Sequence, residues 1–185
     1  MSIRLLRDAV LLRPFRPGEV DELFDLQRSW SADDGVHGGE SLTKRQLARR
    51  LAASGTWVDG PVGLLLAIEA DGRLVGEIQA RGTRSQLLPP GVFELGIELY
   101  RSSDRGKGIG RAAVAEITRY LFEEEHAHRV QLSTDVENRG MRGAAEAAGF
   151  RFEGVMRGFW PSADGRWRDY ALYGTTRDDR AESDA

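Results

Sequence analysis

The segment 105–111 reads Arg-Gly-Lys-Gly-Ile-Gly-Arg, and such closely spaced glycines with basic side chains can bind a phosphate group. Glycines let successive backbone N–H groups converge on an anion, and a helix that begins within the segment would add the positive end of its dipole. The sequence therefore predicts an anion site at this point. The residues expected to contact the ligand are Arg105, Gly106, Lys107, Gly108, Ile109, Gly110 and Arg111.

Two other phosphate-binding loops do not fit this spacing. A P-loop requires Ser or Thr directly after its lysine, and the residue that follows Lys107 is Gly108. A dinucleotide-binding fingerprint requires its third glycine three residues after the second, whereas Gly110 follows Gly108 by two. A glycine-rich turn without a ligand remains the alternative to an anion site.

The elements around this segment are a strand before it and a helix after it. Apolar and polar residues alternate over 93–100, which is typical of a strand with one buried face. Apolar residues then recur at helical spacing over 113–121, and the alternation returns over 130–136. Asn138 is placed to cap a further short helix, which Gly149 would end.

The rest of the chain adds helices and antiparallel strands. Helical patterns cover 18–30 and 42–53, and the Asp-Gly pair at 71–72 indicates a hairpin within 64–80. The predicted strands are 9–12, 64–69, 74–80, 93–100, 130–136, 150–159 and 168–173. This order predicts one α/β domain with a single mixed, mostly antiparallel, twisted sheet and helices on both faces.

This arrangement resembles the GNAT superfamily of N-acetyltransferases. The segment that begins at Arg105 matches the pattern Gln/Arg-x-x-Gly-x-Gly/Ala between a strand and a helix, which in that family binds the pyrophosphate of acetyl-coenzyme A (acetyl-CoA). Asn138 lies eleven residues before Gly149-Phe150, as in the family's Asn…Gly-Phe segment. The order of the predicted elements is the family's order over about residues 9–176.

The resemblance implies acetyl-CoA-dependent transfer of an acetyl group to a primary amine, either a protein N-terminus or a small-molecule amine. The strand at 94–98 and the closing segment 168–174 are most similar to the branch that includes ribosomal-protein N-terminal acetyltransferases. By the same resemblance, the pantetheine arm of the co-substrate lies along the end of this strand. Backbone N–H groups near Leu99 and Tyr100 then contact the thioester carbonyl, and Asn138 contacts the pantetheine or thiol end.

Two glutamates on one face of the strand before the loop are the candidate general bases. A primary amine with a pKa of about 8 to 10 is mostly protonated at neutral pH, so its proton must be accepted before it attacks a thioester. The family commonly carries a carboxylate on this strand. Glu94 matches the usual position best, and Glu98 is the second candidate. For either residue, a solvated glutamate on a sheet face is the alternative.

The sequence departs from the family at the residue that would protonate the leaving thiolate. Met141 and Ala145 stand where members often have serine or tyrosine, and neither side chain can donate a proton. Thiols have a pKa of about 8.5, so a dedicated acid is not essential, and Tyr170 or Tyr173 could replace it. The departure leaves open a non-catalytic acyl-CoA-binding or sensing module. An aminoglycoside-type small-molecule acetyltransferase is a second alternative.

The composition of the chain excludes several classes of function. The 185-residue chain has a net charge of −3, so it lacks the basic excess expected of a nucleic-acid-binding protein. It has no cysteine, which excludes disulfides and a thiolate nucleophile, and its three histidines lack metal-ligand spacing. The longest apolar run, 62–68, is far shorter than the roughly 20 residues of a membrane-spanning helix.

Together with the resemblance to the GNAT superfamily, these limits predict a cytoplasmic enzyme that acts on acetyl-CoA and an amine acceptor, with no metal, nucleic acid or membrane as a partner. A homodimer is compatible with them. The N-acetyltransferase domain is expected to span 1–176, and the acidic remainder, 177–185, is expected to be disordered.

Overall fold

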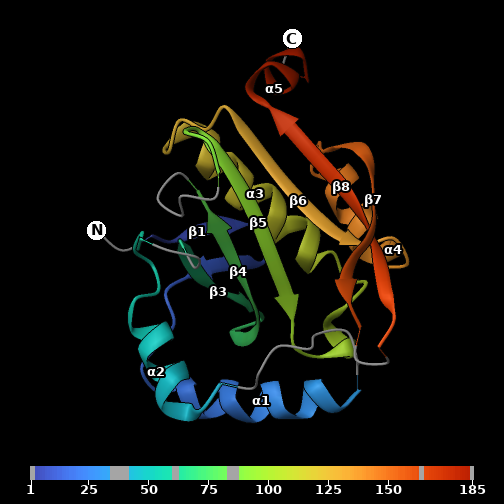
Figure 1. Ribbon diagram of the computed structural model, residues 1–185. Coiled ribbons are helices and arrows are strands. Elements are labelled where there is room, and N and C mark those ends of the chain that lie inside the picture. Colours follow the sequence, from blue (N-terminus) through green and yellow to red (C-terminus); the bar gives the residue numbers. More distant parts are fainter. Residues whose placement is uncertain (1–2, 34–41, 60–62, 83–87, 163–164, 184–185) are drawn as a thin grey trace.

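The computed structural model describes residues 3–33, 42–59, 63–82, 88–162 and 165–183, with the backbone alone for 27–33 and 182–183 (Figure 1). A mixed eight-stranded sheet forms its centre, in the order β1-β2-β3-β4-β5-β6-β8-β7. Neighbouring strands are antiparallel except β5 and β6, which are parallel, so the predicted mostly antiparallel sheet is confirmed. The strands are β1 (Leu5–Arg7), β2 (Val10–Arg13), β3 (Leu64–Ala70), β4 (Arg73–Arg81), β5 (Val92–Leu99), β6 (Arg129–Asp135), β7 (Arg151–Pro161) and β8 (Trp167–Thr176).

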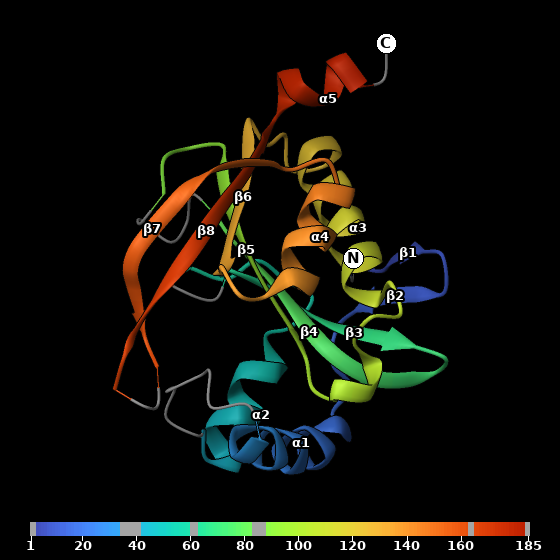
Figure 2. The ribbon, with the colours of Figure 1, turned by 90° about the vertical axis from the view of Figure 1, so that its right-hand side faces the viewer.

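Helices cover both faces of the sheet, as the sequence predicts. Helix α3 packs against β1, β2 and β5 and contacts α4, while α1 and α2 pack together away from them (Figure 2). None of the described helices has the length and apolar composition needed to cross a membrane. The helices are α1 (Glu19–Asp33), α2 (Lys44–Ala52), the short 3-10 helix η2 (Ser102–Asp104), α3 (Ile109–Glu123), α4 (Arg139–Ala147) and α5 (Arg177–Ser183).

The two helical layers produce two apolar clusters on opposite faces of β3. Leu64, Leu66 and Ile68 belong to the cluster that contains the buried residues of α3. Leu65 and Ala67 belong to the cluster that contains the buried residues of α1 and α2. Because side chains alternate along a strand, every residue of the uniformly apolar segment 64–68 is buried by one layer or the other. Burial of each leucine side chain stabilises the folded state by about 1.5–3 kcal/mol relative to an exposed side chain.

Strands β5 and β6 separate before they end. Their parallel pairing runs from Val92 opposite Arg129 to Leu95 opposite Leu132. Both strands continue beyond that point, β5 to Leu99 and β6 to its own end, and they diverge toward their carboxyl ends (Figure 1). Among the described residues, the divergence leaves one edge of β5 without a neighbouring strand next to the loop that enters α3.

Short sequence patterns form the turn between β3 and β4 and the start of helix α2. Asp71 and Gly72 both adopt positive φ angles, 51° and 70°, in the turn that joins β3 to β4. Thr43 accepts a hydrogen bond from the backbone N–H of Gln46, and the Gln46 side-chain oxygen accepts one from the Thr43 N–H. This capping box begins α2.

The two ends of the chain differ from the sequence-based expectation. Strand β1 precedes the predicted first strand and pairs with β2 across a turn at Asp8, whose φ is 51°. This edge strand has only three residues, and Leu6 on it is exposed. The sequence therefore has no alternation of apolar and polar residues that would predict the strand.

The C-terminal segment predicted to be disordered forms helix α5 over its described part. The Asp179 carboxylate accepts hydrogen bonds from the backbone N–H and the hydroxyl of Thr176, and the Asp179 N–H donates back to that hydroxyl. Arg177 donates from its guanidinium to the carbonyl of Ala127 at 2.9 Å. The Thr-x-x-Asp pattern at 176–179 is typical of a helix start, whereas the high charge of the segment is typical of disorder.

Candidate active site

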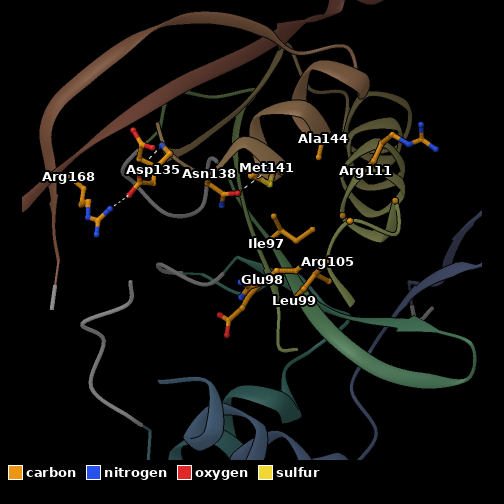
Figure 3. A pocket seen from close by; sticks show the side chains of 15 residues that line it. Ile97, Glu98, Leu99, Arg105, Arg111, Asp135, Asn138, Met141, Ala144 and Arg168 are labelled. Carbon is orange, nitrogen blue, oxygen red and sulfur yellow. Dashed lines mark hydrogen bonds and ion pairs between the residues drawn. The ribbon is translucent and has the colours of Figure 1, made fainter. Parts of the chain in front are cut away.

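A cavity of about 470 Å³ opens where β5 and β6 diverge (Figure 3). This volume is within the range of small-molecule binding pockets. The carboxyl ends of β5 and β6, the loop before α3, the start of α4 and strand β8 all contribute to its wall. The lining residues are Ile97, Glu98, Leu99, Arg105, Gly106, Gly108, Gly110, Arg111, Asp135, Glu137, Asn138, Gly140, Met141, Ala144 and Arg168.

The glycine-rich loop forms its part of the wall in a conformation that requires glycine. Gly106 and Gly108 have φ angles of 74° and 82°, in the left-handed region that side chains disfavour. A Cβ on Gly106 would meet nothing within 4 Å, and one on Gly108 would meet only the Arg111 guanidinium at 3.9 Å. Gly108 is also the N-cap of α3 and provides no side-chain cap. The open space and the uncapped helix start fit a phosphate group.

Most of the predicted ligand contacts line this cavity. They are Leu99, Arg105, Gly106, Gly108, Gly110, Arg111 and Asn138. Lys107 and Ile109 are not among the lining residues. The Lys107 ammonium lies 3.5 Å from the Asp104 carboxylate, and Ile109 is buried in the core.

The backbone N–H groups of Leu99 and Tyr100, both expected to contact the thioester carbonyl, point to opposite edges of β5. The Tyr100 N–H donates to the carbonyl of Val75 at 3.0 Å, so this N–H is engaged with β4. Successive N–H groups of a strand point to opposite edges. The Leu99 N–H therefore points to the edge from which β6 has diverged, and it is the better placed of the two to contact a ligand.

The start of α4 forms the wall opposite the glycine loop. The Asn138 carboxamide oxygen accepts a hydrogen bond from the Met141 N–H at 3.0 Å, which confirms the predicted cap, and the Asn138 side chain lines the cavity (Figure 3). Met141 also lines the cavity, whereas Ala145 is fully buried in the core. Of the two residues at the family's acid positions, Met141 is therefore the one that borders the cavity.

Glu98 is the glutamate of β5 that lines the cavity. Burial raises the pKa of its carboxyl group to about 8, and the nearby charge of Glu77 adds to the rise, while Arg50 and Arg105 oppose it. A general base is most effective when its pKa lies near the working pH. Glu98 is therefore suited to exchange a proton with an ammonium group.

Glu94 lies on the same face of β5 but in different surroundings. Its carboxylate accepts hydrogen bonds from Arg81 at 2.7 Å and from Gln131 at 3.2 Å. It does not line the cavity. Four residues of extended strand, roughly 13 Å, separate it from Glu98. The structure thus brings only the second of the two predicted bases to the glycine loop.

Asp135 and Arg168 line the cavity and were not predicted as site residues. The Arg168 guanidinium lies 3.5 Å from the Asp135 carboxylate, and the other Asp135 oxygen accepts from the Glu137 N–H at 2.8 Å. The two residues come from strands separated by α4 and β7 in the chain. The position of Asp135 close before Asn138 is the one sequence signal that could have indicated it.

The two tyrosines suggested as replacement acids do not line the described cavity. Tyr173 is fully buried, and its hydroxyl donates to Glu146 at 3.0 Å and accepts from Arg142 at 3.1 Å. Tyr170 packs its ring against Phe159, and burial raises the pKa of its hydroxyl.

Comparisons with known proteins agree with this architecture. A family model described as an acetyltransferase (GNAT) domain matches residues 9–151. Mycothiol acetyltransferases of Pseudarthrobacter chlorophenolicus and Arthrobacter sp. (strain FB24) are 31% and 29% identical to the chain over 133 residues. In both cases the match covers 72% of this chain and 40% of the relative, so the chain spans about two fifths of their length.

Solved structures share the fold over nearly the whole chain. The ribosomal L7/L12 alpha-N-protein acetyltransferase in complex with coenzyme A has a TM-score of 0.76 at 15% identity, covering 94% of this chain and 97% of that one. Mycobacterium smegmatis RimJ has a TM-score of 0.71 at 24% identity, covering 96% of this chain and 88% of that one. With the family model matching most of its length, the chain belongs to the GNAT acetyltransferase family.

Proposed function

We propose that this chain is an N-acetyltransferase that transfers an acetyl group from acetyl-CoA directly to a primary amine. The observation that carries the proposal is the placement of Glu98 and the glycine-rich loop on one cavity. One site thereby combines a place for a phosphate-bearing co-substrate with a carboxylate that can accept a proton near neutral pH. Membership of the GNAT family supports this combination.

The residues on the cavity fit acetyl-CoA as the co-substrate. The open glycine loop and the uncapped start of α3 would hold its pyrophosphate. The unpaired edge of β5 would bond the pantetheine arm as an added strand does. The Leu99 N–H would then donate to the thioester carbonyl, where negative charge develops during the reaction.

The residues of the site account for the proton and electron balance of the transfer. Glu98, as a carboxylate, accepts a proton from the substrate ammonium, so the neutral nitrogen forms a bond to the thioester carbon. The carbon–sulfur bond then breaks, and its electron pair leaves with the sulfur. The nitrogen loses its second proton at this step, and the departing thiolate takes up a proton directly from it or through water. The Leu99 N–H stabilises the transient oxyanion. A thiolate of pKa about 8.5 leaves without a dedicated acid, which is compatible with Met141 in the cavity.

The acceptor is an amine of a protein N-terminus or of a small molecule. The names of the similar proteins include both kinds of acceptor, since they are mycothiol and ribosomal-protein acetyltransferases. An aminoglycoside remains among the small-molecule acceptors to be tested. Cytoplasmic location and homodimer formation stay predictions.

A non-catalytic acyl-CoA-binding module is the second candidate. The observation that favours it is Met141, which borders the cavity at a position where the family often carries a proton donor. Such a module would bind acetyl-CoA without turning it over.

An assay for thiol release separates the two candidates. Purified protein is mixed with acetyl-CoA and a panel of amines: peptides with free N-termini, small polyamines and an aminoglycoside. The proposal predicts amine-dependent thiol release, with the acetylated acceptor visible by mass spectrometry. Calorimetric binding of acetyl-CoA without release for any amine would instead support the binding module.

A further inference from the structure

A buried ion pair lies next to Glu98 on the side of the sheet covered by α2. Glu77 on β4 is only 3% exposed, and its register partner on β5 is Glu98. Arg50 of α2 donates two hydrogen bonds to the Glu77 carboxylate, and the Tyr100 hydroxyl donates a third at 2.8 Å. A helix outside the cavity is thus connected to the residue opposite the proposed base.

The strand pairing that places the two glutamates opposite each other includes a close approach at Gly76. A Cβ on Gly76 would lie 2.1 Å from the Glu98 carbonyl oxygen, so β4 and β5 approach too closely here for any other residue. Directly opposite residues in an antiparallel pair have Cβ atoms about 5 Å apart. Glu77 and Glu98 therefore interact as neighbouring like charges whenever both are ionised.

The stability of the fold does not by itself account for the buried ion pair between Glu77 and Arg50. Burying an ion pair stabilises a fold little, and apolar residues of similar size often serve as well. Here the pair places a fixed negative charge, with its compensating cation, beside an ionisable group of the cavity. We propose that Glu77 and Arg50 form a positioning pair for Glu98, in which Glu77 favours proton uptake by Glu98 and Arg50 favours its release.

The proposal rests on the function proposed above, in which Glu98 is the base. The charged groups that act on Glu98 are Glu77 from β4, Arg50 from α2 and Arg105 from the loop before α3. Burial raises the pKa of Glu98, Glu77 raises it further, and the two arginines lower it. The signs of these effects make the roles of Glu77 and Arg50 separable by mutation.

The first test compares the pH dependence of kcat in Glu77→Gln and Arg50→Gln. Removal of the negative charge should move the acid-side inflection to lower pH by about 1 unit, since a like charge near a carboxylate disfavours its ionisation. Removal of the positive charge should move the inflection to higher pH. Arg50→Lys, which keeps the charge, should keep the wild-type inflection. A purely structural role would lower kcat or stability and leave the inflection in place.

An ion pair on the same two strands provides the control. Arg81 and Glu94 are bonded at 2.7 Å, and the pair lies away from the cavity. Arg81→Gln should leave the inflection unchanged. If Arg81→Gln moves the inflection and Glu77→Gln does not, the base is Glu94 and the inference about Glu77 is overturned.

A titration independent of catalysis keeps the two proposals distinguishable. The Glu98 side-chain carboxyl is followed by carbon NMR as a function of pH in wild type and Glu77→Gln, and it is assigned by its absence in Glu98→Gln. A lower midpoint in Glu77→Gln supports the positioning pair even if no amine is acetylated, which would refute only the proposed function. Equal midpoints in a folded Glu77→Gln variant overturn the pair. If Glu77→Gln fails to fold, the double variant Glu77→Gln/Arg50→Gln replaces it. The two charges removed act in opposite directions and Glu77 acts more strongly, so its midpoint should still fall below that of wild type, but by less.

Discussion

Glu98 and Glu94 are the same residue type on the same face of one strand, and they differ only in what surrounds them. Glu94 is bonded to Arg81 and Gln131, whereas Glu98 lies in the cavity beside the buried Glu77. Alternation along the strand predicts that both share a face but cannot predict these partners. The partners come from β4 and β6, so the distinction between the two glutamates exists only in the folded sheet.

The raised pKa of Glu98 makes a prediction about stability. Between its ordinary value of 4.5 and about 8, the folded protein holds a proton at Glu98 that the unfolded chain has lost. Stability from this group therefore falls as pH rises through that window. Glu98→Gln should match wild type in urea unfolding below the window and exceed it above. A variant less stable than wild type above the window would show that the ionised carboxylate is not disfavoured in the fold.

At the scale of elements, the loop before α3 is predicted to bind the co-substrate through its backbone. Gly108→Asp puts a carboxylate into the open space at the start of α3 and strains a residue whose φ is 82°. We expect acetyl-CoA binding to weaken by at least about 100-fold in calorimetry. Arg105→Ala should have a smaller effect, because it removes one charge and leaves the amides in place. Wild-type affinity for acetyl-CoA in a folded Gly108→Asp protein would show that the co-substrate does not bind to this loop.

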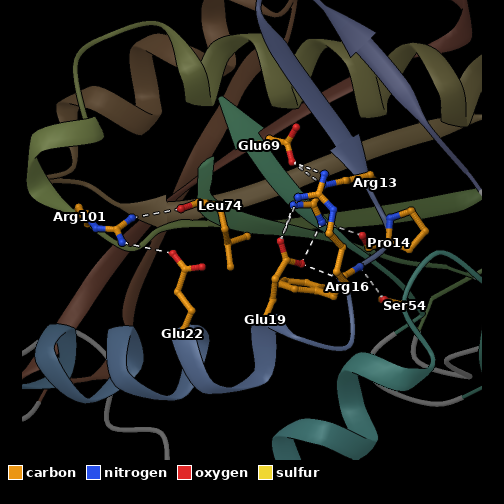
Figure 4. A network of polar contacts seen from close by, with 10 residues as sticks. Arg13, Pro14, Arg16, Glu19, Glu22, Ser54, Glu69, Leu74 and Arg101 are labelled. Carbon is orange, nitrogen blue, oxygen red and sulfur yellow. Dashed lines mark hydrogen bonds and ion pairs between the residues drawn. The ribbon is translucent and has the colours of Figure 1, made fainter. Parts of the chain in front are cut away.

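A second set of contacts fixes α1 against the sheet (Figure 4). Arg13 at the end of β2 is only 2% exposed, and it bonds Glu19 of α1 at 2.5 Å and Glu69 of β3 at 2.8 Å. Farther along the helix, Glu22 lies 3.5 Å from Arg101, which lies two residues after the end of β5. These contacts set the position of α1 below the end of β5.

Arg13→Ala should lower the free energy of unfolding by about 3–5 kcal/mol, because it removes the buried cation that bonds both Glu19 and Glu69 and leaves these carboxylates only their contacts with Arg16. Arg16→Ala is the matched control. Its side chain is exposed, although it bonds the same Glu69, so its loss should cost no more than about 1 kcal/mol. Burial opposes the ionisation of Glu19, but the bond from Arg13, the bond from the Arg16 backbone N–H and the charges of both arginines together outweigh burial and lower the Glu19 pKa. The stability from this group is therefore lost as pH falls below 4.5 in wild type, and this loss should be smaller in Arg13→Ala. Chemical denaturation of the two variants across acid pH checks both expectations.

For the molecule as a whole, the sequence predicts the fold better than the site. Alternation, glycines and caps such as Asn138 and Gly149 are local, and they predict most strands, the helix after the glycine loop and the fold class. The cavity depends on where β5 and β6 diverge, and Arg168 reaches it from a strand distant in the chain. The lysine of the loop, Lys107, matches the motif but lies against Asp104, because a motif specifies residue types and not the contacts they make.

The pH dependence of kcat for acetyl transfer, measured in wild type, Glu98→Gln and Glu94→Gln with one amine, tests the account most directly. The account predicts an acid-side inflection near the Glu98 pKa of about 8 in wild type and in Glu94→Gln. In Glu98→Gln, kcat should fall by about 10²–10⁴-fold, and the loss should shrink at high pH, where the free amine is abundant. An unchanged profile in Glu98→Gln would contradict the account, and a loss confined to Glu94→Gln would transfer the role of base to Glu94.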